Sequence, residues 1–96
     1  MTNLERTEVR IPTILRPYTK GEKVVGASGT TVSEIISSLE SDFPGLADRL
    51  LEKGELRRFI NIYINDEDVR FMGSLEAPVK NGDSITILPA VAGGQM

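Results

Sequence analysis

One amphipathic helix pattern stands between two groups of strand-like segments in this chain of 96 residues. Thr31 and Glu34 have the spacing of a capping box, in which the threonine oxygen accepts a backbone N–H and the glutamate reaches back to the cap residue. Pro44 disfavours helical geometry at Phe43 and ends the predicted helix there. The apolar face of this helix comprises Val32, Ile35, Ile36, Leu39 and Phe43.

The segments around this helix have the composition of strands and turns. Strands are predicted at 9–15, 23–27, 59–65, 69–72 and 84–88, and a second short helix at 46–52. Pro12 cannot donate to a ladder, so the first strand needs an unpaired point or a bulge there. A hairpin, a helix, a short helix and three strands predict an α+β fold of the β-grasp type, a mixed sheet with one main helix packed on one face.

The composition supports a single domain with little side-chain chemistry. Its 11 basic and 14 acidic residues give a net charge of −3, which argues against a nucleic-acid ligand. The sequence has no cysteine and no histidine, which excludes disulfides, zinc fingers, cysteine nucleophiles and imidazole bases. No apolar run is long enough to span a membrane, and Met1–Glu8 is too polar for a signal peptide. We therefore expect a cytoplasmic protein with no membrane contact, no bound cofactor, no metal and no catalytic residue.

The chain is expected to have loose ends. Residues 1–7 are predicted to be a flexible segment, 8–88 the folded domain, and 89–96 a flexible tail. Gly93 and Gly94 lie in that tail, and backbone without Cβ atoms can enter a channel too narrow for side chains. Six residues from Pro89 to Gly94 span at most about 20 Å, which is enough to reach the active site of another protein.

Strand alternation places two aliphatic side chains toward solvent near the end of the sheet. If Ile11 and Ile87 face the helix, then Ile14 and Leu88 face away from it. Single exposed aliphatic residues are ordinary on protein surfaces. The two interpretations are therefore a surface without function and a docking patch for a partner protein.

Three other patterns have simple structural interpretations. The acidic run 66–68 lacks the glycine and distal glutamate of a calcium loop, so it indicates a turn. The stretch 26–31 lacks the lysine of a P-loop and indicates a connection. A basic area near the third and fourth strands is either a solvated face or a contact with an acidic partner. It comprises Lys53, Arg57, Arg58 and Arg70.

The stretch Gly82–Gly94 resembles the signature end of the ThiS/MoaD family of ubiquitin-like sulfur carriers. The stretches Ile11–Pro17 and Asn61–Phe71 are similar to the carriers of bacterial cysteine biosynthesis in that family, and they are more specific than the tail. The similarity extends from about Glu8 to Gly94. It implies the ubiquitin-like β-grasp fold.

The resemblance implies a protein cosubstrate rather than an enzyme. An E1-like (MoeB/ThiF-type) enzyme would consume ATP to adenylate the carboxylate of Gly94, and sulfide or a persulfide would displace AMP to leave a thiocarboxylate. Its sulfur would attack an aminoacrylate formed from O-phosphoserine on a PLP-dependent cysteine synthase. A zinc-dependent JAMM-type metalloprotease would release the cysteine. Family members dock partners on the open apolar face of the sheet, which favours that role for Ile14 and Leu88, while Gly93 provides clearance.

Gln95 and Met96 depart from the family pattern, which ends at the second glycine. Gly94 has no free carboxylate while they remain, so we expect cleavage between Gly94 and Gln95 by the same class of metalloprotease. A cloning remnant is the alternative explanation of these two residues. Three other functions stay open: sulfur donation to thiamin, molybdopterin or a sulfur-containing natural product; conjugation to lysines as a ubiquitin-like modifier; and an interaction domain whose tail is never activated.

Overall fold

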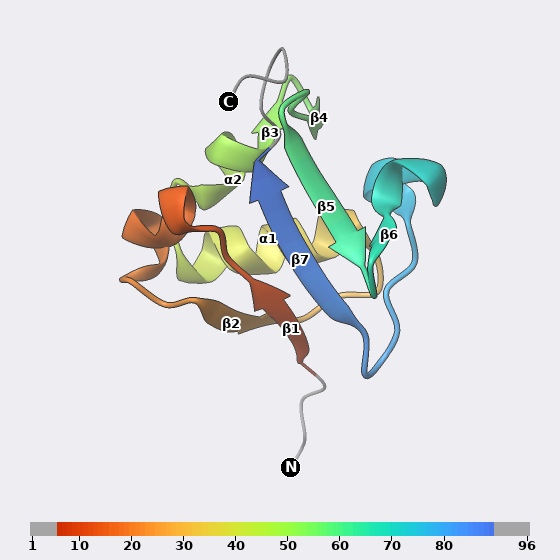
Figure 1. Ribbon diagram of the computed structural model, residues 1–96, viewed down its shortest axis with the longest axis horizontal. Coiled ribbons are helices and arrows are strands. Elements are labelled where there is room, and N and C mark those ends of the chain that lie inside the picture. Colours follow the sequence, from red (N-terminus) through yellow and green to blue (C-terminus); the bar gives the residue numbers. More distant parts are fainter. Residues whose placement is uncertain (1–5, 90–96) are drawn as a thin grey trace.

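The structure is a computed structural model, and it describes residues 6–89. A five-stranded sheet has the order β2-β1-β7-β5-β6, and β3 pairs with β4 in a separate two-stranded ribbon (Figure 1). The strands are β1 (Thr7–Arg10), β2 (Val24–Ala27), β3 (Leu51–Glu52), β4 (Glu55–Leu56), β5 (Ile60–Ile64), β6 (Glu67–Asp68) and β7 (Ser84–Pro89). The α-helices are α1 (Val32–Asp42) and α2 (Leu46–Leu50), and the 3₁₀ helices are η1 (Thr13–Thr19), η2 (Val69–Phe71) and η3 (Ser74–Glu76).

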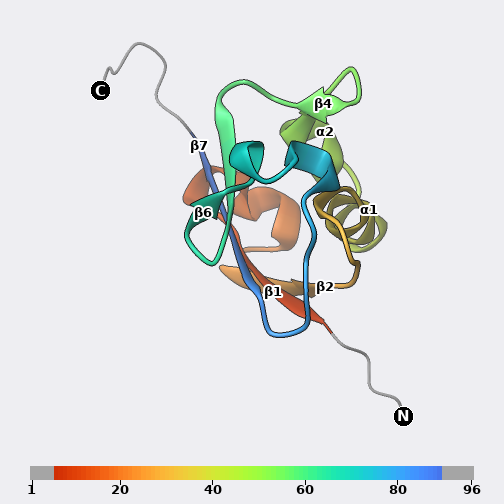
Figure 2. The ribbon, with the colours of Figure 1, turned by 90° about the vertical axis from the view of Figure 1, so that its right-hand side faces the viewer.

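The sheet is mixed, and α1 covers one of its faces. β1 pairs in parallel with β7, whereas the other neighbours in the sheet are antiparallel. Viewed almost along the axis of α1, the helix lies on one side of the strands (Figure 2). Alternate side chains of the central strands meet the apolar face of α1 in the core, which includes Val9, Leu39, Ile62, Ile85 and Ile87. This arrangement confirms the predicted β-grasp fold.

The start of α1 keeps half of the predicted capping box. The Thr31 hydroxyl oxygen accepts the Glu34 N–H at 3.2 Å. The carboxylate of Glu34, however, accepts from the backbone N–H of Thr30 at 2.7 Å and from its hydroxyl at 3.0 Å, not from the cap residue. Gly29 lies against the same turn, where an added Cβ would be 2.6 Å from the Glu34 Cβ. The glycine of this connection therefore serves a close approach within the fold.

The predicted first strand is too long. β1 ends at Arg10, and the chain turns into η1, a 3₁₀ helix that contains Ile14. Pro12 stands at the N-cap of this helix with extended geometry, φ −70° and ψ 157°. Because proline lacks the N–H that a ladder needs, it stops the pairing instead of producing a bulge. The Ile11 N–H still donates to the Lys23 carbonyl at 2.8 Å.

Two later predictions also need correction. The segment 69–72 was expected to be a strand, but it forms η2, which the Asp68 carboxylate caps by accepting the Arg70 N–H at 2.9 Å. The short strand β6 instead falls on Glu67–Asp68. The predicted helix 46–52 ends at Leu50, and its last two residues form β3. Side-chain capping at Asp68 offers the backbone an alternative to the ladder, which strand propensity alone does not detect.

The first and last strands each extend one residue beyond the predicted domain of 8–88. β1 begins at Thr7, one residue before the predicted domain, and β7 ends at Pro89, the first residue of the predicted tail. Residues 1–5 and 90–96 of the predicted end segments lie outside the described residues. Within 6–89, no helix is long and apolar enough to cross a bilayer.

Candidate functional site

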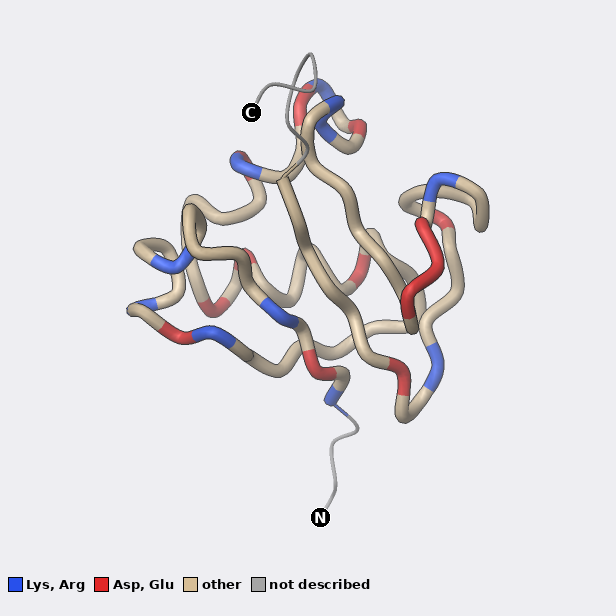
Figure 3. The backbone as a smooth tube through the Cα atoms, viewed as in Figure 1, with Lys and Arg blue, Asp and Glu red and all other residues tan. Residues whose placement is uncertain are grey.

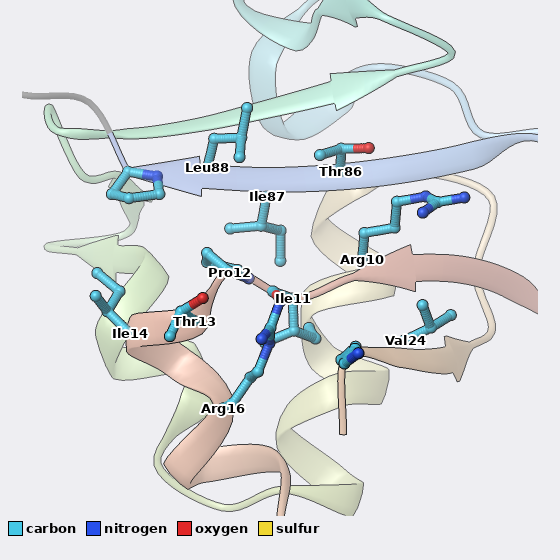
Figure 4. A pocket seen from close by; sticks show the side chains of 12 residues that line it. Arg10, Ile11, Pro12, Thr13, Ile14, Arg16, Val24, Thr86, Ile87 and Leu88 are labelled. Atoms are coloured by element: carbon cyan, nitrogen blue, oxygen red, sulfur yellow. The ribbon is translucent and has the colours of Figure 1, made fainter. Parts of the chain in front are cut away.

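The last strand ends at an apolar surface. Leu88 is 45% exposed and Ile14 is 60% exposed, and both line a groove of about 550 Å³ beside the end of β7 (Figure 4). The solvent exposure predicted for the two residues is therefore found. Figure 4 also places Pro12 between them, with Arg10 and Arg16 at the margins.

A second groove adjoins the first, and the two share apolar residues. It has a volume of about 480 Å³ and shares Ile14 and Pro89 with the first groove. Phe59, which is 49% exposed, lines only the second groove. We call Ile14, Phe59, Leu88 and Pro89 the docking patch, after the role predicted for Ile14 and Leu88 from the sequence. Pro89, the last described residue, thus lines both grooves.

Two different local structures expose the aliphatic side chains of the docking patch. Leu88 faces away from α1 by strand alternation, because Ile87 is 1% exposed and points into the core. Ile14 is exposed because η1 turns it outward while the adjacent Leu15 packs inward at 4% exposure. The exposure of Leu88 was thus predicted for the right reason, and that of Ile14 for the wrong one.

Arg70 holds the segment that carries Phe59. Its Nη2 donates to the carbonyl oxygens of Arg57 at 2.9 Å and Ile60 at 2.8 Å, and its Nη1 donates to Asn61 Oδ1 at 2.8 Å. Charged donors make stronger hydrogen bonds than neutral ones. Arg70 therefore fixes the entry to β5 and with it one wall of the second groove.

The predicted basic area separates into residues with different surroundings. Arg57 and Arg58 line the second groove. Arg70 is engaged by the three hydrogen bonds to the 57–61 segment. Lys53 stands in the β3–β4 turn with a positive φ of 55° and lines neither groove.

Sequence reasoning missed Phe59 and Val24 as exposed apolar residues. Val24 is 43% exposed and lines the first groove. The sequence contained a signal for both residues. Ile60 points inward, so strand alternation makes the preceding Phe59 point outward. Val24 stands opposite Arg10 in the register, next to the inward pair of Val25 and Val9.

Three carboxyl groups with lowered pKa belong to the scaffold and line neither groove. Hydrogen bonds from the Thr30 N–H and hydroxyl lower the pKa of Glu34, and those from the Ala47 and Gly45 N–H groups lower the pKa of Glu40. The Lys80 N–H, followed by the Asn65 side chain, lowers the pKa of Asp83. These groups stabilise helix starts and a turn. Within the described part of the chain, no three Asp, Glu, His or Cys side chains are grouped to hold a metal ion.

The remaining predicted site residues belong to the tail that follows Pro89. Gly93, Gly94 and Gln95 lie outside the described residues. What the structure gives is the position from which the tail starts, at Pro89 between the two grooves.

Comparison with known proteins identifies the family. The sequence model of the ThiS family matches residues 9–94. The chain belongs to the ThiS family. The match ends at Gly94, so Gln95 and Met96 lie beyond the part that this family shares. The resemblance found from sequence is thereby confirmed.

Relatives of this ThiS-family chain cover nearly all of it. It is 57% identical over 89 residues to sulfur carrier protein CysO of Mycobacterium tuberculosis, covering 90% of this chain and 96% of that protein. It superposes with a TM-score of 0.88 and 61% identity on a chain of the Amycolatopsis orientalis BexX/CysO complex, covering 92% and 99% of the two chains. It also matches small archaeal modifier protein 1 of Methanosarcina acetivorans with a TM-score of 0.80 and 32% identity, over 97% of this chain and 100% of the other.

Proposed function

We propose that this chain is a sulfur carrier protein of cysteine biosynthesis, which donates sulfur as a thiocarboxylate at Gly94. The observation that carries the proposal is the 57% identity to sulfur carrier protein CysO over 90% of the chain. The family match through Gly94 supports it, as does the placement of Pro89 at the docking patch, where an enzyme that holds the patch can receive the tail.

The chemistry uses the main chain rather than a side chain. A carboxylate is a poor electrophile, so an E1-like adenylating enzyme joins the Gly94 carboxylate to AMP from ATP with release of pyrophosphate. Sulfide then forms a C–S bond as the C–O bond to AMP breaks, which leaves the thiocarboxylate. Because Gly93 and Gly94 have no Cβ atoms, the backbone of the tail can approach the reacting groups closely. The carrier in this scheme is a protein cosubstrate.

Processing must precede activation. While Gln95 and Met96 remain attached, the carbonyl of Gly94 is part of a peptide bond, so there is no free carboxylate to adenylate. A zinc-dependent JAMM-type metalloprotease would cleave the Gly94–Gln95 bond. We place the pathway in the cytoplasm, because the activation step consumes ATP.

The product of sulfur transfer tests the proposed pathway. The chain ending at Gly94 is converted to the thiocarboxylate and mixed with a PLP-dependent cysteine synthase and O-phosphoserine. The expected result is a carrier with cysteine amide-linked at Gly94, detected by intact mass and released as free cysteine by the metalloprotease. A thiocarboxylate that persists unchanged with an active synthase would contradict the cysteine pathway and favour thiamin, molybdopterin or a natural product as the destination.

A second candidate function is conjugation to lysines as a ubiquitin-like modifier. The match to small archaeal modifier protein 1, with a TM-score of 0.80 and 32% identity, favours it. Both functions begin with adenylation of Gly94, so the products distinguish them. Isopeptide-linked adducts of this chain in cell extracts, absent when Gly94 is deleted, would support the modifier function.

A further inference from the structure

Basic side chains gather around the docking patch of a chain that is acidic overall. The net charge is −3. The two grooves are nevertheless lined by six of the chain's 11 basic residues and by one of its 14 acidic residues, Glu52. We call the six basic residues the basic rim: Arg10, Arg16 and Lys23 in the groove of Leu88, and Arg49, Arg57 and Arg58 in the groove of Phe59.

Neighbouring carboxylates compensate only part of this charge. Arg10 pairs with Glu8 at 3.2 Å, and Arg57 pairs with Glu52 at 3.5 Å, with all four side chains substantially exposed. Exposed pairs of this kind are weak and are screened by salt. The remaining four rim residues form no ion pair with another residue of the described 6–89 range. Acidic segments lie at β6 and before β7, and others lie on β1 and on the β3–β4 ribbon (Figure 3).

Contacts with aromatic rings and backbone hold several rim side chains beside the apolar surface. The Arg58 guanidinium carbon lies 5.6 Å from the centre of the Phe59 ring, and that of Arg49 lies 5.4 Å from the centre of the Tyr18 ring. Arg16 uses its Nε to donate to the Ile11 carbonyl at 3.1 Å. A guanidinium has five N–H donors. Within residues 6–89, the Arg16 bond is the single hydrogen bond that these three side chains donate, so their other N–H groups can bind a further acceptor.

We infer that the docking patch binds a partner protein whose contact face is acidic around an apolar centre. This inference rests on the proposed function, which requires an enzyme to hold the base of the tail. Stable interfaces combine an apolar centre with a polar rim, and complementary charge accelerates association and disfavours wrong partners. Ile14, Phe59 and Leu88 supply the centre. That centre favours a protein over an anionic polymer, which needs only the positive charge.

Charge reversal in the rim tests the inference on the chain ending at Gly94. The double variant Lys23→Glu/Arg58→Glu changes one residue in each groove, and neither side chain carries a hydrogen bond or ion pair within the described structure. Lys20→Glu/Lys80→Glu is the matched control, because it has the same net charge and neither residue lines either groove. Affinity for the E1-like adenylating enzyme, purified without ATP, is measured for both variants and the parent at low and physiological salt.

The expected result is at least a tenfold weaker affinity for the rim variant at low salt, a smaller loss at physiological salt, and little change for the control. Equal affinities of the rim and control variants, or no binding of the parent chain, would overturn the inference. Heparin, a polyanion, is the ligand for a second comparison. If both variants lost affinity for heparin and for the enzyme to the same extent, binding would reflect general attraction between charges, and the inference would be overturned. Thiocarboxylate formation by the parent, read by mass, reports separately on the proposed function.

Discussion

Ile60 stands directly opposite Pro89 in the antiparallel pairing of β5 with β7. The chain therefore stays in the sheet up to the residue from which the tail starts. Phe59 precedes one member of this pair and Leu88 precedes the other, so the same register brings both exposed side chains to the base of the tail. Ile14 reaches this place from η1, and Arg70 fixes the segment before Ile60.

Substitution in the docking patch is expected to weaken partner binding without unfolding the domain. Leu88→Asp and Ile14→Asp each place a carboxylate where a partner must bury an apolar side chain, so we expect at least a tenfold increase in the Kd for the adenylating enzyme. Phe71→Asp is the matched control, since Phe71 is 84% exposed and lines neither groove. Calorimetric titration gives the Kd. Equal effects of Leu88→Asp and Phe71→Asp would refute the docking role of this end of the sheet.

Substitution on the core face of β7 is expected to reduce the stability of the domain instead. Ile87→Ala removes buried methyl and methylene groups from a side chain that is 1% exposed and should lower the free energy of unfolding by about 2–5 kcal/mol. Leu88→Ala, one residue later, should change it by less than about 0.5 kcal/mol. Denaturant unfolding followed by circular dichroism checks both values. Similar losses would show that the strand does not have the alternation described.

Loss of the Arg70 hydrogen bonds is expected to reduce stability and to loosen the wall of the second groove. Arg70→Gln cannot span the carbonyls of Arg57 and Ile60 together with Asn61, so we expect a loss of about 1–3 kcal/mol. Arg58→Gln controls for the charge, because Arg58 makes only the ring contact with Phe59 among the described residues. Amide hydrogen exchange in the 57–61 segment should increase for Arg70→Gln alone. Unchanged exchange there would mean that Arg70 does not hold this wall.

Acid is expected to destabilise the fold through carboxylates at helix starts and turns. The folded-state pKa of Glu40 is lowered by N–H donors from Ala47 and Gly45, so its stabilising effect is complete above the unfolded-state pKa of about 4.3. That effect is lost as pH falls through the lower folded-state pKa. Glu40→Gln should therefore lower the Tm at pH 7 and flatten the fall of Tm between about pH 5 and 3. Parallel Tm curves for the parent and the variant would contradict this role.

Much of the fold could be predicted because local signals and burial agree. The Thr31 cap, the apolar face of α1 and the alternation in β5 and β7 all point to one arrangement, and the structure has it. The prediction failed where a local hydrogen bond or a proline competes with the strand. Pro12 ends β1 early, and the Asp68 cap turns the next residues into η2.

The candidate site could be predicted only in part, because it is formed by residues distant in sequence. Alternation identified Leu88, but the joining of Ile14 and Phe59 around Pro89 depends on the pairing of β5 with β7 and on the path of η1. The six basic residues of the rim likewise come from separate segments of the chain. No spacing rule in the sequence brings them together, so the charge arrangement emerges only from the fold.

Removal of one glycine is expected to abolish sulfur transfer and leave the fold intact. The chain ending at Gly94 should form a thiocarboxylate, and the chain ending at Gly93 should form none above background. In the shorter chain the terminal carboxylate lies one residue short of the reacting position in the adenylating enzyme. All buried core residues lie within 9–87 of the described chain, so both forms should have the same Tm. Equal thiocarboxylate yields from the two forms would refute Gly94 as the reacting residue.

The central claim is tested most directly by the intact mass of the full chain after incubation with the metalloprotease, the E1-like enzyme, ATP and sulfide. The account predicts loss of Gln95 and Met96, followed by replacement of one oxygen by sulfur. The second change should require ATP and should not occur when the protease is omitted. An unchanged mass, with enzymes that process a control carrier, would contradict the account and favour an interaction domain whose tail is never activated.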